Sequence, residues 1–196
     1  VPGLGGVGSG ESFMEAVRFL KSVKVLMDVV YDSKEKDTSI ELFGKKFDMP
    51  VFMAPIGGMN LNYNGYFEES EYLKIIVPAM IKSGSLAFLP NGAIDKMYYD
   101  QLPLVKENGG LAIPTIKPWG KEKLIKMIHD AEEAGAIAVA VDIDSCGHPN
   151  LKLAGSKVEA YSPETLTEII ESINIPFIAK GIMTKDAAIR CRDAGC

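Results

Sequence analysis

Lys180 stands at the end of an entirely apolar run, residues 175–179, and this placement is the first sign of chemistry in the sequence. A continuous apolar run is typical of a parallel strand that is covered on both faces. An ammonium group at the end of such a strand is costly to bury unless it meets an anion. Lys180 is therefore a candidate to stabilise negative charge; the alternative is a side chain that extends to water.

Asp142 and Asp144 form a second candidate feature, because they lie two residues apart at the end of the apolar run 137–143. Their side chains point to the same side if the strand continues through both. Paired carboxylates can carry out acid/base chemistry or hold a metal ion. The alternative is that one of them caps the next helix or binds loop amides.

Two further motifs are weaker signals. Residues 3–8 satisfy the pattern GxGxxG, but no strand leads into them, so a mobile glycine-rich segment is favoured over a dinucleotide site. His129 lies beside Asp130 in a charged helical pattern and is expected to be a solvated bystander. His148 follows the run 137–143, where a functional position and a flexible surface position are both open.

The elements that position these residues are five short apolar runs separated by segments with helical periodicity. The runs are residues 51–54, 86–89, 111–116, 137–143 and 175–179. Each lacks polar alternation, which predicts parallel strands. Amphipathic helices are predicted over residues 69–82 and 121–134. Ser162 with Pro163, and Thr184, predict two more helix starts, whereas Pro103 makes 94–107 a poor fit to one helix.

Similar glycine-containing joints end the helices and predict the architecture. Gly84 and Gly135 each precede an apolar run, and Gly195 ends a third copy of the joint without a run behind it. We therefore predict an α/β fold: a (β/α)8 TIM barrel, here truncated after about five βα units. An open five-stranded sheet is the alternative.

The first 48 residues are expected to form a leader before this barrel portion, residues 49–196. Residues 12–31 favour one or two helices, and residues 39–43 and 46–47 favour a hairpin around Gly44 that closes the bottom of the barrel. Chemistry in barrel enzymes lies at the carboxyl ends of the strands. Those ends are predicted at residues 54–58, 90–92, 114–119, 142–144 and 180–181.

Composition excludes several classes of protein. The chain has 196 residues, 47% of them hydrophobic and 24% charged, and a formal charge of −5, which argues against nucleic-acid binding. No apolar run is long enough to span a membrane, so a cytoplasmic protein is expected. The cysteines predict neither disulfides nor zinc, and we expect no metal. The basic cluster is interpreted as the solvent side of a helix and its preceding loop; its members are Lys117, Lys121, Lys123 and Lys126.

Four segments together resemble one enzyme family. They are residues 8–13, 43–51, 54–57 and 176–182, whose order and spacing match along the whole chain. They are similar to the FMN-dependent 2-hydroxy-acid oxidases and dehydrogenases, the family of glycolate oxidase, lactate oxidase and flavocytochrome b2. The resemblance covers the N-terminal portion of such an enzyme.

The resemblance implies roles for several residues. Pro55, Ile56 and Gly57 would lie along the flavin ring, and Asn91 would meet its polar edge. Lys180 would lie near the flavin N1 and O2 edge, where a cation stabilises the charge that reduction creates. Asp144 would pair with the catalytic histidine, and Asp142 would contact the flavin where the family commonly has a threonine.

Other family residues fall at changed positions or lie outside the sequence. The family's leader tyrosine aligns with Gly6, and its flavin-contacting glutamine and second tyrosine align near Pro114 and Ile116. The catalytic histidine, the substrate arginine and the FMN phosphate cradle belong after Cys196. A chain ending there is expected to be inactive alone.

The implied function is FMN-dependent oxidation of a small 2-hydroxy acid, such as lactate or glycolate, to a 2-keto acid. The implied partner is that small molecule, without nucleic acid or membrane, and a homo-oligomer is expected. One alternative is another FMN or nucleotide barrel, such as type 2 isopentenyl diphosphate isomerase or an IMP dehydrogenase relative. A second is a non-catalytic half barrel that acts as an assembly module, because an unclosed sheet leaves edges and apolar surface to cover.

Overall fold

The computed structural model describes residues 9–148, 151 and 153–196, and its centre is a four-stranded parallel sheet. The strands are β3 (Ala87–Leu89), β4 (Ala112–Ile116), β5 (Val139–Asp142) and β6 (Phe177–Lys180), in the spatial order β3-β4-β5-β6. Four of the five predicted runs therefore form neighbouring parallel strands. Strands that follow each other in the chain pair with each other, as successive βα units require.

The first predicted strand, residues 51–54, is shorter than expected. Only Met53 bridges the sheet, in parallel with Ala87. The Met53 amide donates to the Leu86 carbonyl at 3.2 Å, and the Phe88 amide donates to the Met53 carbonyl at 3.0 Å. The run thus occupies the place of a strand beside β3, but pairing ends at Pro55, the next position in register with Met53, because proline supplies no amide hydrogen.

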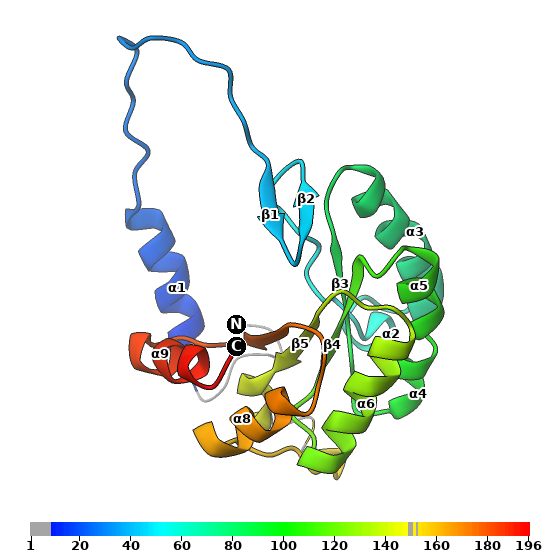
Figure 1. The fold of residues 1–196 in the computed structure, drawn as a ribbon. Helices are drawn as coiled ribbons and strands as arrows, with labels where there is room; N and C mark the ends of the chain where they lie inside the picture. The colour runs from blue at the N-terminus through cyan, green and yellow to red at the C-terminus, as the bar shows by residue number, and fades with distance from the viewer. Residues whose placement is uncertain (1–8, 149–150, 152) are drawn as a thin grey trace.

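Helices cover one face of the sheet (Figure 1). They are α3 (Glu69–Lys82), α4 (Asp95–Tyr99), α5 (Leu102–Glu107), α6 (Lys121–Glu133), α8 (Pro163–Glu171) and α9 (Lys185–Asp193). Val139 and Val141 pack with Leu124 and Ile128 of α6 on this face. A doubly wound sheet would carry helices on both faces and reverse its strand order. Sequential order with helices on one face is instead the wall of a barrel, so the barrel prediction is confirmed.

The predicted helix signals act where the sequence places them. The Ser162 hydroxyl accepts from the Thr165 amide at 3.1 Å, and the Thr184 hydroxyl accepts from the Ala187 amide at 3.2 Å. Pro103 lies in the first turn of α5, so residues 94–107 form two short helices in place of one. Gly84, Gly135 and Gly195 end their helices with positive φ, as the repeated joints predict.

The leader contains the expected hairpin, formed by β1 (Ile40–Leu42) and β2 (Lys45–Phe47). Phe47 is 3% exposed and packs on Leu86, Ile113 and Ala138. These three residues lie within one residue of the amino ends of β3, β4 and β5, on the face opposite the helices. The hairpin therefore fills the bottom of the barrel wall.

The helical expectation for residues 12–31 is only partly correct. Helix α1 spans Glu11–Ser22 and ends where Val23 takes an extended conformation. Residues 23–29 form no helix, and Val25 is 96% exposed. Several β-branched residues follow Val23, and such residues restrict helix formation. An isolated helix also needs a packed face for most of its stability, and α1 has no buried residue among its described side chains. A further short helix, α2 (Met59–Asn62), follows the first strand position.

Candidate active site

Three charged side chains come together at the carboxyl ends of β4, β5 and β6. They are Lys117, Asp142 and Lys180. They lie four, four and two residues beyond Ile113, Ala138 and Ile178, which pack in the cluster around Phe47 of the hairpin. Side chains alternate between the two faces of a strand, so all three lie on the inner face of the barrel wall. The mouth opposite the hairpin is therefore charged, while the bottom is apolar.

Asp142 holds both lysines. The Lys117 Nζ donates to its Oδ2 at 2.6 Å, and the Lys180 Nζ donates to its Oδ1 at 2.7 Å. The β5–β6 register places Asp142 directly opposite Lys180. The side chains of Lys117 and Asp142 are 18% and 12% exposed, and that of Lys180 is 41% exposed. Lys180 is thus paired with a carboxylate and does not merely extend to water.

The pKa values of Asp142 and Asp144 are shifted in opposite directions. Burial alone would raise the pKa of Asp142, but the Lys117 charge and hydrogen bonds from Lys117 and Lys180 lower it to about 2. Burial, together with the neighbouring Asp142 carboxylate, raises the pKa of Asp144 above its usual range, against the attraction of Lys180 and Lys117. The two neighbouring carboxylates therefore have different proton affinities, as is common in acid/base sites.

Asp144 lies beside Asp142, but not because one strand continues through both residues. The strand ends at Asp142 and a 3-10 helix, η1 (Ile143–Gly147), follows, so the strand does not continue through both aspartates. The Ser145 hydroxyl donates to the Asp142 carbonyl at 2.7 Å and so stabilises this turn. The Asp144 carboxyl lies against Gly181, which has φ +91° and where a Cβ atom would collide with it. Lys180 and Asp144 accordingly lie at the same end of the sheet.

The sequence-predicted flavin-contacting residues lie at the same end. Asn91 is 8% exposed, and its Oδ1 accepts from the Lys117 amide at 3.2 Å, while its Nδ2 is buried without a hydrogen-bond partner. A Cβ atom on Gly57 would lie 2.6 Å from the Cβ of Pro90. This close approach brings residues 55–57 against the end of β3. Of these, Ile56 is 39% exposed and Pro55 is partly buried.

Glu69 fixes the loop that carries Gly57. Its Oε2 accepts from the amides of Gly58 and Met59 at 2.9 and 3.1 Å, and Glu69 itself begins helix α3. The carboxylate therefore ties the loop after the first strand position to the helix that follows it.

The structure brings all of the sequence-predicted site residues to one edge of the barrel wall. They are Pro55, Ile56, Gly57, Asn91, Asp142, Asp144 and Lys180.

The interpretation of Lys117 as part of a solvent-facing basic cluster is wrong. Lys121, Lys123 and Lys126 do form exposed ion pairs, but Lys117 turns inward to Asp142. Lys117 directly follows the apolar run 111–116, just as Lys180 follows the run 175–179. This shared position is the sequence feature that indicates an inward-facing lysine.

The register of β4 also identifies an inward-facing hydroxyl. Ile116 packs with Trp119 and Leu124 on the helix side. Thr115 therefore lies on the inward face of β4, two residues before Lys117. Pro114 and Ile116, near which the family's glutamine and second tyrosine align, do not face inward. The Thr115 Oγ1 is buried without a hydrogen-bond partner.

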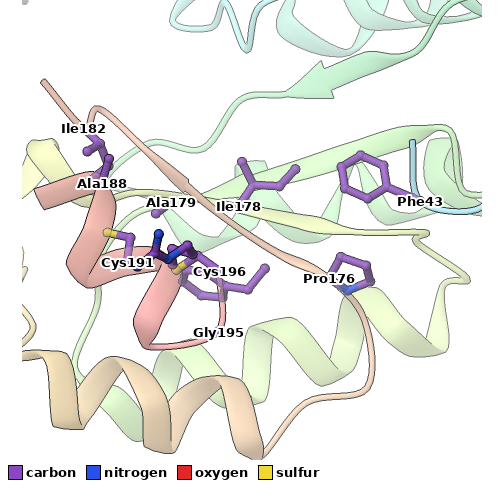
Figure 2. Close-up of a pocket in the computed structure, with 11 residues that line it drawn as sticks. Phe43, Pro176, Ile178, Ala179, Ile182, Ala188, Cys191, Gly195 and Cys196 are labelled. Atoms are coloured by element: carbon purple, nitrogen blue, oxygen red, sulfur yellow. The ribbon is translucent and has the colours of Figure 1, made fainter. Parts of the chain in front are cut away.

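A second hollow, beside β6 and α9, lacks acid/base chemistry. The hollow has a volume of about 430 Å³ and a mainly apolar lining. Figure 2 shows Ala179 of β6 on the side of the strand that faces Cys191 of α9, whereas Ile178 points away from the helix. Burial, with the neighbouring Cys191, raises the pKa of the Cys196 thiol to about 12, so this thiol is a poor nucleophile at neutral pH. The charged mouth is the better candidate for catalysis.

His129 is not part of the charged mouth. His129 lies on α6, outside the wall, with its Nδ1 2.8 Å from Glu132 Oε2. The glycine motif at residues 3–8 lies outside the described residues. Within the described part of the chain, no cluster of three or more His, Cys, Asp or Glu side chains could hold a metal, and no helix is long and apolar enough to cross a membrane.

The charge of Asp142 should make the fold sensitive to acid. Its pKa is lower in the folded protein than in the unfolded chain, so its contribution is complete above about pH 4 and is lost as the pH falls towards 2. We expect Asp142→Asn to remove up to about 2 kcal/mol of this pH-dependent stability. Urea unfolding between pH 5 and 2 measures the difference. Asp95→Asn, at an exposed ion pair, is the control; equal slopes for wild type and Asp142→Asn would contradict the prediction.

Comparison with known proteins agrees with this geometry. The family model described as FMN-dependent dehydrogenase matches residues 4–154. L-lactate dehydrogenase of Haemophilus influenzae (strain KW20 / Rd) is 37% identical over 57 residues, which are 29% of this chain and 15% of that protein. A mandelate oxidase structure with benzoyl-formic acid has a TM-score of 0.74 at 19% identity, covering 100% of this chain and 62% of the other.

A lactate oxidase structure from Pediococcus acidilactici has a TM-score of 0.61 at 21% identity, covering 83% of this chain and 49% of that one. The chain thus spans about half to three fifths of the length of these structural relatives. Both structures share the fold at low identity. The family model covers most of the sequence, and the chain therefore belongs to the FMN-dependent dehydrogenase family.

Proposed function

We propose that the enzyme containing this chain oxidises a small 2-hydroxy acid, of the lactate or glycolate type, to the 2-keto acid with FMN. The observation that carries the proposal is the pair of ammonium groups around Asp142 at the barrel mouth. Such a site stabilises anions, and the reaction involves two, the substrate carboxylate and the reduced cofactor. The local identity to L-lactate dehydrogenase supports a lactate-sized substrate.

FMN is the cofactor of this family, and the residues at the mouth fit its ring. Asn91 Nδ2 and Thr115 Oγ1 are buried polar atoms without protein partners, as expected of groups that meet a polar ligand. Residues 55–57 would hold the flat side of the ring, with Gly57 allowing the loop to pack closely. Asn91 would bind its polar edge, and Lys180 its N1 and O2 edge. When bound, FMN supplies the acceptor for the two electrons of the oxidation.

Lys180 is proposed to hold a positive charge where negative charge develops. Asp142 positions its ammonium group at 2.7 Å, which fixes an otherwise flexible side chain. Because Asp142 also binds Lys117, it does not neutralise the two lysines fully. A fixed cation requires no rearrangement as the reaction proceeds, and this is the main source of electrostatic catalysis.

Asp144 is proposed to orient the catalytic histidine that the family resemblance places after Cys196. Both oxygens of Asp142 already accept from lysines, which leaves Asp144 as the carboxyl group free of these two ion pairs. A carboxylate that accepts from an imidazole N–H fixes the tautomer that can remove a proton from the substrate. Asp144 would thus be a positioning residue.

Anaerobic mixing of the complete FMN-loaded enzyme with lactate, glycolate or mandelate tests the function. We expect bleaching of the flavin by at least one of these acids, with one equivalent of 2-keto acid formed per flavin. Flavin that stays oxidised with every 2-hydroxy acid would exclude the proposed activity.

Asp144→Asn is expected to lower kcat/KM by about 10- to 100-fold, the size of effect seen when the partner that orients a functional histidine is removed. A histidine with a lowered pKa stays unprotonated to lower pH, so the acidic limb of the kcat/KM profile should move to lower pH and the loss should be largest at neutral to high pH. Asp142→Asn is the matched comparison two residues away. A larger shift of the pH profile in Asp142→Asn than in Asp144→Asn would transfer the role to Asp142.

A further inference from the structure

Cys191 and Cys196 are brought together by the way helix α9 ends. The helix is followed by Gly195, which has φ +102°. The Cys196 amide donates to the Cys191 carbonyl, and the Gly195 amide donates to the Arg192 carbonyl, both at 3.0 Å. These two hydrogen bonds around a left-handed glycine form a Schellman motif, in which the side chains at the two ends of the longer hydrogen bond commonly contact each other.

The geometry of this turn is compatible with a disulfide. A disulfide requires Cα atoms no more than about 7 Å apart. The 3.0 Å hydrogen bond between Cys196 and Cys191, with the backbone bonds on either side of it, keeps their Cα atoms within that distance. The two residues form no CxxC motif. Their pairing therefore comes from the turn and not from their spacing in the sequence.

Both thiols can be reached by a small molecule. Cys191 and Cys196 line the hollow beside β6 and α9, whose volume of about 430 Å³ is within the range of small-molecule sites (Figure 2). Cys196 is exposed and Cys191 is partly exposed. The third cysteine, Cys146, lies apart from them in η1. The turn of α9 thus holds two accessible thiols side by side.

We propose that Cys191 and Cys196 are a redox modification site, which a low-molecular-weight disulfide such as oxidised glutathione converts reversibly into an intramolecular disulfide. The Cys191 thiolate attacks one sulfur of the small disulfide, whose S–S bond breaks, and the first glutathione leaves and takes up a proton. Cys196 then loses its proton and attacks the Cys191 sulfur, which releases the second glutathione. Two cysteine thiols are oxidised, and one small disulfide is reduced to two thiols. The inference goes beyond the proposed function and does not depend on it.

Cys191 is the thiol that reacts first. Burial, together with the charge of Cys191 and a hydrogen bond to it, raises the pKa of Cys196 to about 12, so Cys196 is protonated at neutral pH. Once Cys191 carries glutathione, its charge is gone and that part of the shift disappears. Cys196 then attacks a sulfur of the same turn, so the second step is intramolecular.

Oxidised glutathione added anaerobically to the complete FMN-loaded enzyme tests the site. Free thiols are blocked after the reaction and the protein is cut with trypsin. Arg190 and Arg192 flank Cys191, so trypsin separates the two cysteines. We expect a disulfide to hold their two fragments together, at about 2 Da less than the sum of the fragments, until a thiol reductant is added. Cys146→Ser is the matched control and should give the same linked fragments.

Two further variants separate the roles of the thiols. Cys196→Ser should stop the reaction at the mixed disulfide, with one glutathione on Cys191. Cys191→Ser should leave Cys196 to react at least about 10-fold more slowly than Cys191 does in Cys196→Ser, because Cys196 is rarely ionised. Alanine variants give the same readouts if a serine variant does not fold.

Two outcomes would contradict the assignment. Wild-type fragments that stay separate, or a wild-type mixed disulfide that persists, would overturn the pairing of Cys191 with Cys196. Equal rates in Cys191→Ser and Cys196→Ser would overturn the order of attack.

Discussion

Lys180→Met in the complete enzyme is expected to slow reduction of the bound flavin by the substrate about 10²- to 10³-fold. Removal of one preorganised group that stabilises developing charge typically has this effect. Substrate binding should change only a few-fold, because the charge that Lys180 stabilises is absent until electrons arrive. Rapid mixing without oxygen separates the two quantities, since the reduction rate at saturation and the substrate concentration for half-maximal rate are read from one titration.

The structure indicates that Lys180→Met should leave the rest of the charged cluster paired. Asp142 keeps its second partner, Lys117, so the substitution does not leave a buried carboxylate unpaired. The flavin midpoint potential should fall in parallel with the rate, which a purely structural role would not produce. Lys185→Met, at the exposed start of α9, is the matched control. An unchanged reduction rate in Lys180→Met would remove Lys180 from the mechanism.

Much of the barrel wall could be predicted because its signals are local. The apolar runs that become β3 to β6 need no partner to be recognised, and Ser162 and Thr184 cap helices with their own hydroxyls. The first strand and the helical leader depend on tertiary contacts instead. Met53 pairs through a single bridge, and residues 23–29 have the composition of a helix or a strand but no packing partner among the described residues.

The site residues that could be predicted from the sequence are those that directly follow an apolar strand. Lys180 was identified because a charge ends an apolar run, and the same reasoning applies to Lys117. Lys117 was missed because the lysines that follow it suggested one solvent-facing group, whereas the turn into α6 separates them. The sharing of Asp142 between two lysines could not be predicted, because it depends on the register of three strands.

The polypeptide of residues 1–196 by itself is expected neither to retain FMN tightly nor to oxidise lactate or glycolate. Phosphate-binding barrels commonly hold the anion with loops after strands seven and eight and a short helix N-terminus. The described wall contains four paired strands and the Met53 bridge. Under the proposed function its inner edge would offer only ring contacts, from residues 55–57, Asn91 and Lys180.

The physical reason is that affinity for FMN comes largely from its phosphate. Charge-assisted hydrogen bonds to a phosphate are among the strongest that a protein makes, whereas packing against a ring at an open wall leaves one side in water. Proton removal from the substrate also needs a base, which the family resemblance places on the following strand. Both contributions would be missing, so the loss should be complete for turnover and at least about 10³-fold for flavin affinity, equivalent to roughly 4 kcal/mol.

Flavin fluorescence measures both expectations on the purified polypeptide. Titration with FMN should show no saturation in the micromolar range, and addition of lactate or glycolate should not bleach the flavin. The complete enzyme, handled in the same way, is the positive control. Stoichiometric binding with substrate-driven bleaching by residues 1–196 would show that the phosphate site and the base lie within this sequence, and that the roles assigned to Asp144 and Lys180 must be reassigned around them.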